Sequence, residues 1–140
     1  MRYLFDTCVV SELTKRDPDP AVLRFVESCD ESSVYLSVLT VGEIVKGITK
    51  LADAQRRTLL EDWLENRLKP RFHGRVLAIT DRVAEVWGEV QGAAERDGCP
   101  IPTIDGLLGA TAIVHDLVVV TRNESDIGRT GAKVLNPWTK

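Results

Sequence analysis

The stretch of sequence that decides the fold is Leu117-Val118-Val119-Val120-Thr121-Arg122-Asn123-Glu124-Ser125-Asp126. Its first four residues form the most apolar strand-like run in the chain, and the acidic residue Asp126 lies a few positions beyond them. A strand that is apolar at every position, and not only at every second one, is typical of a parallel sheet covered by helices on both faces. We therefore expect a central parallel strand at residues 118–121.

Strands and helices alternate along the rest of the chain. Further strands are predicted at residues 2–5, 32–37, 75–79 and 133–135. Helices are predicted from a Thr7 cap through Leu13, from Pro20 through Val26, and at residues 40–51, 53–68, 81–96 and 103–115. The last of these helices is rich in Gly and Ala, so another element should pack closely on it. The order predicts an α/β fold: one domain over residues 1–140, with a central parallel sheet and helices on both faces.

Size and composition describe an ordinary globular domain. The chain has 140 residues, of which 44% are hydrophobic and 28% charged, and its formal net charge of −3 would not by itself attract phosphates. Three cysteines without a C-x-x-C pair argue against a disulfide framework or a zinc site and fit a reducing compartment. We find no secretory signal and no apolar run long enough to span a bilayer. The expected location is therefore cytoplasmic, with no membrane partner.

Four acidic residues each lie where a predicted strand gives way to a helix: Asp6, Glu43, Asp105 and Asp126. The carboxyl ends of parallel strands share one edge of the sheet, so these side chains should converge there. Clustered carboxylates repel and raise one another's pKa values, and a divalent cation is the ordinary way to keep them ionised. Carboxylate oxygens suit Mg²⁺ or Mn²⁺ better than zinc. The sequence therefore predicts a metal site at this edge.

Each acid taken singly also has a structural explanation. Glu43 could complete a capping box with Thr40, Asp105 could favour the positive end of a helix dipole, and Asp126 could be a turn residue. Asp6 has the weakest such explanation, because a carboxylate directly after a buried strand is costly unless something pairs with it. The joint placement of the four acids favours a site.

The sequence lacks the motifs of serine hydrolases, dinucleotide-binding proteins and P-loop proteins, and its basic residues allow two interpretations. There is no G-x-S-x-G, G-x-G-x-x-G or P-loop motif, and Cys8 stands where an aspartyl-phosphate phosphatase would have a second acid. Arg122 and Arg129 flank the expected site and are candidates for phosphate contacts. The basic run at residues 69–75 is interpreted first as a solvated loop and second as an RNA-contacting patch.

Four blocks of the sequence resemble PIN-domain ribonucleases: Asp6-Thr7-Cys8-Val9-Val10-Ser11-Glu12-Leu13, Leu36-Ser37-Val38-Leu39-Thr40-Val41-Gly42-Glu43-Ile44, Ile101-Pro102-Thr103-Ile104-Asp105 and Thr121-Arg122-Asn123-Glu124-Ser125-Asp126. The likeness is strongest to the VapC-family toxins of VapBC toxin–antitoxin pairs, including the FitB-like branch. The chain ends in Asn136-Pro137-Trp138 before its last two residues, and an Asn-Pro-Trp ending is also common in that branch. Two positions depart from the pattern: Cys8 replaces an Asn or Ser, and Ile127 replaces a Phe. Neither departure removes a carboxylate.

The resemblance implies a twisted parallel sheet and metal-dependent cleavage of RNA. Carried over residue by residue, the acidic metal-site residues are Asp6, Glu43, Asp105 and Asp126, supported by Thr7 and Asn123. The resemblance also implies a homodimer and a cognate VapB-like antitoxin that forms a hetero-oligomer with it and blocks the active-site groove with its C-terminal segment.

The expected mechanism is hydrolysis of a phosphodiester by a metal-activated water. Asp6 and Asp105 would hold the principal Mg²⁺ or Mn²⁺ ion, Asp126 would complete that site or bind a second ion, and Glu43 would orient or deprotonate the water. Thr7 would fix Asp6 by a hydrogen bond. The products would carry a 5′-phosphate and a 3′-hydroxyl. Two alternatives stay open: a non-catalytic PIN-like scaffold that binds a partner, and a metal-dependent phosphatase acting on small substrates.

Overall fold

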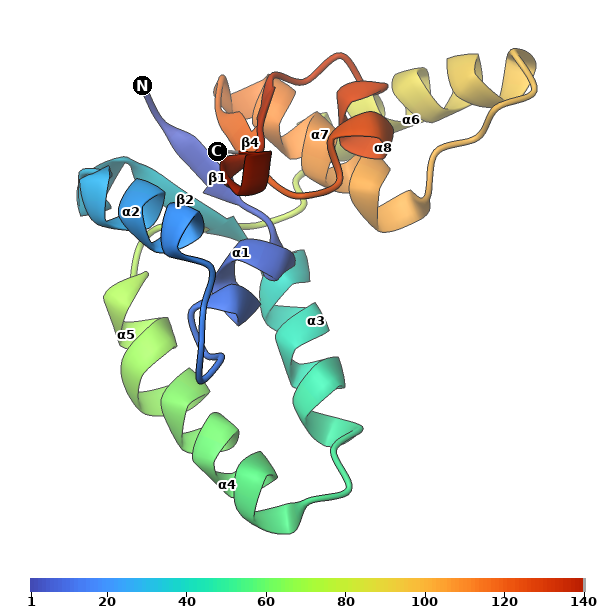
Figure 1. Ribbon diagram of the computed structural model, residues 1–140. Helices are drawn as coiled ribbons and strands as arrows, with labels where there is room; N and C mark the ends of the chain where they lie inside the picture. Colours follow the sequence, from blue (N-terminus) through green and yellow to red (C-terminus); the bar gives the residue numbers. More distant parts are fainter. Residues whose placement is uncertain (140) are drawn as a thin grey trace.

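The protein is built around a five-stranded parallel sheet, as the alternation of elements predicts (Figure 1). A computed structural model describes residues 1–139. In chain order the strands are β1 (Tyr3–Phe5), β2 (Val34–Ser37), β3 (Val76–Leu77), β4 (Val118–Val120) and β5 (Val134–Leu135). They are shorter than predicted: for example, β2 starts two residues late because a 3₁₀ turn, η1 (Glu31–Ser33), precedes it.

The order of the strands creates a switch point at the centre of the sheet. The order is β3-β2-β1-β4-β5, so the chain moves outward from β1 to β3 and then returns to β4 on the other side of β1. Phe5 pairs with Val120, so β1 and β4 end level with one another. Ligands of open parallel sheets bind outside the carboxyl ends of the strands at such a point. Asp6 and Thr121, which directly follow the two strands, therefore lie where a ligand is expected.

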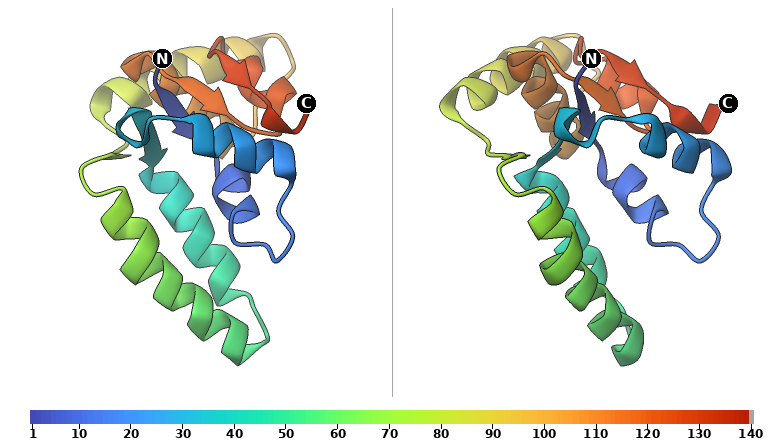
Figure 2. Two further views of the ribbon diagram at one scale, coloured as in Figure 1. Left: turned by 60° about the vertical axis from the view of Figure 1, so that its left-hand side comes forward. Right: turned by 90° about the vertical axis from the view of Figure 1, so that its left-hand side faces the viewer.

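Helices cover both faces of the sheet (Figure 2). They are α1 (Thr7–Glu12), α2 (Pro20–Ser28), α3 (Val38–Thr49), α4 (Ala54–Trp63), α5 (Lys69–Arg71), α6 (Asp81–Arg96), α7 (Thr103–His115) and α8 (Glu124–Gly128). A π-helical turn, η2 (Leu64–Leu68), joins α4 to α5, and η3 (Pro137–Thr139) is a 3₁₀ turn near the C-terminus. The bounds of α6 and α7 agree with the prediction, whereas α8 was not predicted and contains Asp126.

Successive residues of the central strands β1 and β4 pack into two separate hydrophobic cores, one on each face of the sheet. Phe5 and Val120 pack with apolar side chains of α1, α2, α3 and η2, while Leu4 and Val119 pack with those of α7 and α8. A third cluster joins α6 to α7. Because side chains of a strand alternate between its faces, an all-apolar strand buries both faces, as the sequence pattern indicates.

Helix α7 packs closely on its neighbours, as its Gly-rich sequence predicts. A Cβ atom on Gly109 would lie 2.2 Å from the Thr130 hydroxyl oxygen, and one on Gly106 would lie 3.1 Å from the Trp87 ring. These contacts leave little freedom to the helix that carries Asp105. Among residues 1–139, no helix combines the length and the apolar character that a bilayer crossing requires.

Candidate active site

Asp6 anchors the site at the end of β1. Its backbone N–H donates to the Val120 carbonyl at 3.0 Å, across the switch point. The residue is only 8% exposed, and its side chain accepts from the Thr7 N–H at 2.7 Å, the Thr121 hydroxyl at 2.8 Å and the Cys8 thiol at 3.7 Å. These donors satisfy a carboxylate that would otherwise be costly to bury. Asp6 also caps α1, so the prediction that Thr7 is the cap is wrong.

Glu43 reaches the site from α3. Its Oε1 accepts a hydrogen bond from the Thr7 hydroxyl at 2.5 Å. The capping-box interpretation is wrong, because Ser37 caps α3 and Thr40 lies inside the helix, where its buried hydroxyl has no partner among the described residues. Ser37 can start the helix early because its hydroxyl accepts a backbone N–H of the first turn. Thr7 was expected to orient Asp6, and its amide does so, but its hydroxyl orients Glu43.

Asp105 lies in the first turn of α7, as predicted. Its Oδ2 accepts from the Asn123 side-chain amide at 2.9 Å, so Asn123 contacts one of the four acids. The backbone N–H of Asn123 donates in turn to the Thr121 hydroxyl at 2.9 Å. Thr121 is therefore connected to Asp6 directly and to Asp105 through Asn123.

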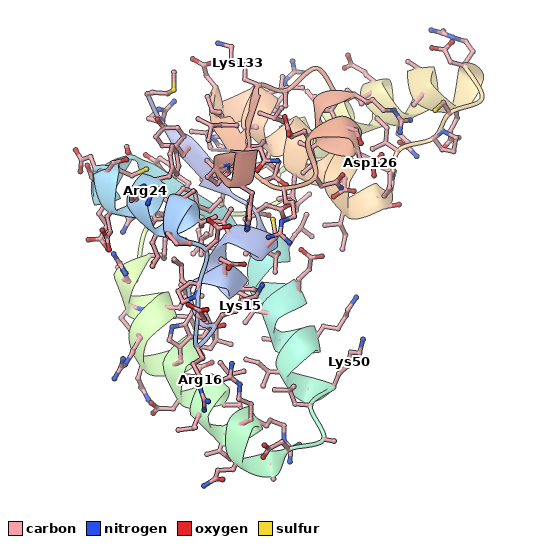
Figure 3. The ribbon with its side chains drawn as sticks, in the orientation of Figure 1. Lys15, Arg16, Arg24, Lys50, Asp126 and Lys133 are labelled. Carbon is pink, nitrogen blue, oxygen red and sulfur yellow. The ribbon has the colours of Figure 1, made fainter. Side chains whose placement is uncertain are left out.

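Asp126 lies in the first turn of α8 and is not a turn residue (Figure 3). Its Oδ1 pairs with the Arg129 guanidinium at 3.2 Å. The same guanidinium donates to the backbone carbonyls of Cys99 and Pro100, in the loop that leads to α7. Arg129 was considered as a phosphate contact, but these internal partners occupy its guanidinium. Arg129 therefore connects Asp126 and α8 to the loop that precedes α7 and Asp105.

Three of the predicted acids act electrostatically on the fourth, Asp105. Burial raises the pKa of Asp105 above its ordinary value, and the charges of Asp6, Asp126 and Glu43 raise it further, while the hydrogen bond from Asn123 opposes the shift. Coulombic coupling of this kind falls with distance, so it requires the acids to be neighbours. The structure thus brings the four carboxylates, from four separate segments of the chain, to one edge of the sheet.

The donor set fits a hydrated hard cation. All four acids offer carboxylate oxygens, yet no group of three Cys, His, Asp or Glu side chains within residues 1–139 is arranged to hold one ion by itself. Mg²⁺ keeps several waters and is usually bound through one or two protein carboxylates, so it does not require a closed protein cage. A carboxylate has about four acceptor positions, so Asp6 and Asp105 retain some beside their hydrogen bonds.

Two residues that contact the acids were missed as site residues. Thr121 is fully buried and bonds both Asp6 and the Asn123 backbone, and its position directly after the central strand is the signal that could have revealed it. Cys8 lies between Asp6 and Thr121 and accepts the Arg122 N–H at 3.4 Å. Burial and the charge of Asp6 raise the pKa of the Cys8 thiol, which therefore stays protonated and acts as a weak donor.

The basic run at residues 69–75 begins in helix α5, so its interpretation as a loop is wrong for residues 69–71, and two of its arginines are bonded to other parts of the fold. Arg71 pairs with Glu31, and Arg75 donates to the carbonyls of Glu31 and Val34 at 2.6 and 2.5 Å. The Arg75 guanidinium also lies over the Phe72 ring, 4.8 Å from its centre. These contacts connect the end of the α4–α5 segment to β2, so the arginines serve the fold and the RNA-contacting interpretation loses support.

Comparison with known proteins identifies relatives over the whole chain. A family model described as the PIN domain matches residues 3–133. The VapC ribonuclease Y4jK of Sinorhizobium fredii is 34% identical over 135 residues, which are 96% of each chain. Toxin FitB of Neisseria gonorrhoeae is 33% identical over 135 residues, 96% of this chain and 97% of the relative. The crystal structure of FitAcB from Neisseria gonorrhoeae matches with a TM-score of 0.94 and 33% identity, covering 99% of both chains.

Proposed function

The chain belongs to the PIN-domain family, and we propose that it is the toxin of a type II toxin–antitoxin pair, a VapC-type endoribonuclease that hydrolyses RNA phosphodiesters. The observation that carries the proposal is the group of four carboxylates, Asp105 with Asp6, Glu43 and Asp126 around it, at the switch point of the sheet. Relatives of at least 33% identity that are named a VapC ribonuclease and a toxin support this function.

PIN-domain ribonucleases depend on a divalent metal ion, and we propose Mg²⁺ for this chain, with Mn²⁺ as a substitute. Such an ion lowers the pKa of a water and neutralises charge at phosphorus. Asp6 and Asp105 would hold it, because both are fixed by protein donors and both retain free acceptor positions. Asp126 would complete this site or bind a second ion, in the orientation set by Arg129.

Glu43 is the proposed base. The Thr7 hydroxyl binds its Oε1 and leaves the other oxygen for the attacking water. Glu43 would remove a proton from this water as its oxygen bonds to phosphorus; the P–O3′ bond breaks and the 3′ oxygen takes a proton from solvent, which yields a 5′-phosphate and a 3′-hydroxyl. Asn123 has a positioning role, because its amide donates to Asp105 and leaves the other carboxylate oxygen of that residue open.

The test is cleavage of a single-stranded RNA pool with and without EDTA. We expect EDTA to abolish cleavage and excess Mg²⁺ or Mn²⁺ to restore it, with 5′-phosphate ends on the products. Full cleavage in EDTA would contradict the metal mechanism. A metal-dependent phosphatase would instead hydrolyse p-nitrophenyl phosphate and spare the RNA, and a non-catalytic scaffold would act on neither.

The same proposal includes partners and location. A VapB-like antitoxin would bind this chain and block the site, and the toxin itself would form a homodimer. The exposed side chains of Val38 and Val45, seven residues apart on one face of α3, support a protein contact of this kind. The free thiols Cys8, Cys29 and Cys99 support a reducing, cytoplasmic location. Co-purification with the product of an adjacent short reading frame tests the antitoxin, and light scattering tests the dimer.

A further inference from the structure

The backbone of Arg122 is fixed at the edge of the proposed active site. Arg122 lies between Thr121, which donates to Asp6, and Asn123, which donates to Asp105. Its own N–H donates to the Cys8 sulfur at 3.4 Å. The start of its side chain is therefore held relative to the carboxylates.

The guanidinium of Arg122 is held by two contacts and is otherwise exposed. It lies over the Trp138 ring, 4.3 Å from the ring centre, and its Nη2 is 3.9 Å from Oε1 of Glu12. The side chain nevertheless remains 57% exposed. Stacking on an aromatic ring occupies the face of a guanidinium and leaves its N–H edge free to bind another group.

Glu12 is a buried anchor for two cations. It is 4% exposed, its Oε1 pairs with the Lys15 ammonium at 2.9 Å, and its Oε2 accepts the Asp19 N–H at 2.8 Å. These partners, the Lys15 hydrogen bond first, hold the pKa of Glu12 below its ordinary range, so it stays ionised. One carboxylate thus faces Lys15 and Arg122, and a net positive charge remains at the surface. Lys15 is 55% exposed, so both cations are open to a ligand.

The arrangement keeps Arg122 away from the catalytic carboxylates. A free guanidinium beside four acids would pair with one of them and compete with the metal ion. In the part of the chain that the structure describes, Arg122 forms an ion pair with Glu12 and with none of the four acids. Trp138 and Glu12 therefore supply the contacts that hold this charge next to the site without neutralising the site itself.

We propose that Arg122 and Lys15, positioned by Trp138 and the buried Glu12, form a subsite that binds a backbone phosphate of single-stranded RNA beside the scissile bond. This inference rests on the proposed nuclease function. Arginine suits a phosphate because its N–H edge can donate two parallel hydrogen bonds, and lysine adds a compact charge. Arg75 and Arg129 are less suited, because several internal contacts occupy their guanidinium groups.

The test measures RNA binding without chemistry. A fluorescent single-stranded RNA oligonucleotide is titrated in EDTA at several KCl concentrations with wild-type protein, Arg122→Gln and Lys15→Gln. Each lost phosphate contact should reduce the slope of log affinity against log salt by about 0.7. Arg24→Gln is the matched control, because Arg24 is exposed on α2, away from Asp126 (Figure 3), and its loss should leave the slope unchanged.

Steady-state cleavage separates binding from chemistry. With Mg²⁺, Arg122→Gln and Lys15→Gln should raise KM severalfold while kcat changes little. Trp138→Ala should also raise KM, and Trp138→Phe should restore it, because Phe keeps an aromatic face for the guanidinium. If Trp138 were only structural, Trp138→Ala would lower Tm without changing KM.

The outcomes are distinct from those of the nuclease test. Cleavage by the wild type together with unchanged salt slopes and KM in both charge variants would overturn the subsite. A fall in kcat at constant KM would also overturn it, because Arg122 would then act on the reaction and not on binding. Absence of any RNA cleavage by the wild type with Mg²⁺ would refute the nuclease function, whereas the salt slopes in EDTA would still decide whether the two cations bind RNA.

Discussion

The two central strands and the α3–α4 hairpin supply the same site in different ways. At the strand ends, Asp6 is buried and bonded by donors from Thr7, Cys8 and Thr121, and the pairing of β1 with β4 sets its position. The hairpin projects from the sheet (Figure 2), and it brings Glu43 to the site through one hydrogen bond from the Thr7 hydroxyl.

This difference distinguishes Asp6, a metal ligand fixed by several donors, from Glu43, a base held by a single hydrogen bond. A carboxylate held by several donors and a paired strand cannot turn without breaking them, which suits a metal ligand. A carboxylate held on one oxygen by a single hydroxyl keeps its other oxygen free, which suits proton transfer. Substitutions at each side of the site test whether this division is real.

The largest effect is expected from Asp6→Asn. Loss of the ligand charge should lower kcat by about 1000-fold or more. Tm should stay within a few degrees of wild type, because Asn also caps helices and the Thr121 hydroxyl can accept from the new amide. RNA cleavage and thermal unfolding measure the two quantities. A variant that is active at the wild-type rate, or one that is unfolded, would show that Asp6 is not a ligand of the kind proposed.

A smaller loss is expected from Glu43→Gln. The neutral amide still accepts from the Thr7 hydroxyl but cannot take a proton, so kcat should fall about 100-fold with little change in Tm. Thr40→Val is the control on the same helix. Because the Thr40 hydroxyl is buried without a partner, its loss should leave both rate and stability unchanged or raise stability slightly. Normal turnover of Glu43→Gln would assign that residue a structural role.

The hydroxyls that hold the two acids should differ in importance. Thr121→Val removes a donor to Asp6 and the acceptor of the Asn123 N–H, and should lower kcat about 10- to 100-fold. Thr7→Val keeps the hydrogen bond from the Thr7 backbone N–H to Asp6 and should lower kcat about 10-fold or less. The serine variants should recover most of each loss. Equal losses of kcat in Thr121→Val and Thr7→Val would contradict the distinction between Asp6 as a fixed ligand and Glu43 as a base held by a single hydrogen bond.

The smallest effect concerns stability of the metal-free protein. The raised pKa of Asp105 means that the folded state keeps this proton to higher pH than the unfolded chain, so stability falls as pH rises above the ordinary aspartate pKa of about 3.9. Asp105→Asn should therefore raise Tm in EDTA at pH 7 by about 1–3 °C, a shift expected of a partly exposed charge. The gain should shrink toward pH 4, and a constant or reversed difference across this range would contradict the repulsion.

Local signals in the sequence predicted the fold well. The helix predicted at residues 103–115 has the bounds of α7, and the all-apolar run Val118–Val120 correctly indicated a buried parallel strand. The cap of α3 was assigned to Thr40 because Thr-x-x-Glu matches a capping box, yet Ser37 offers the same chemistry three residues earlier. Helix α8 was missed because Glu124–Gly128 is too short to show a helical period.

The sequence by itself determined the alternation of strands and helices, the parallel sheet and the gathering of four acids at its edge. These follow from local apolar patterns and from the geometry of parallel strands. Only the tertiary structure decided which donor each acid receives. The Thr7–Glu43 bond spans 36 positions and the Thr121–Asp6 bond spans 115, and the choice between competing hydroxyls and amides depends on distances of a few tenths of an ångström that no local pattern encodes.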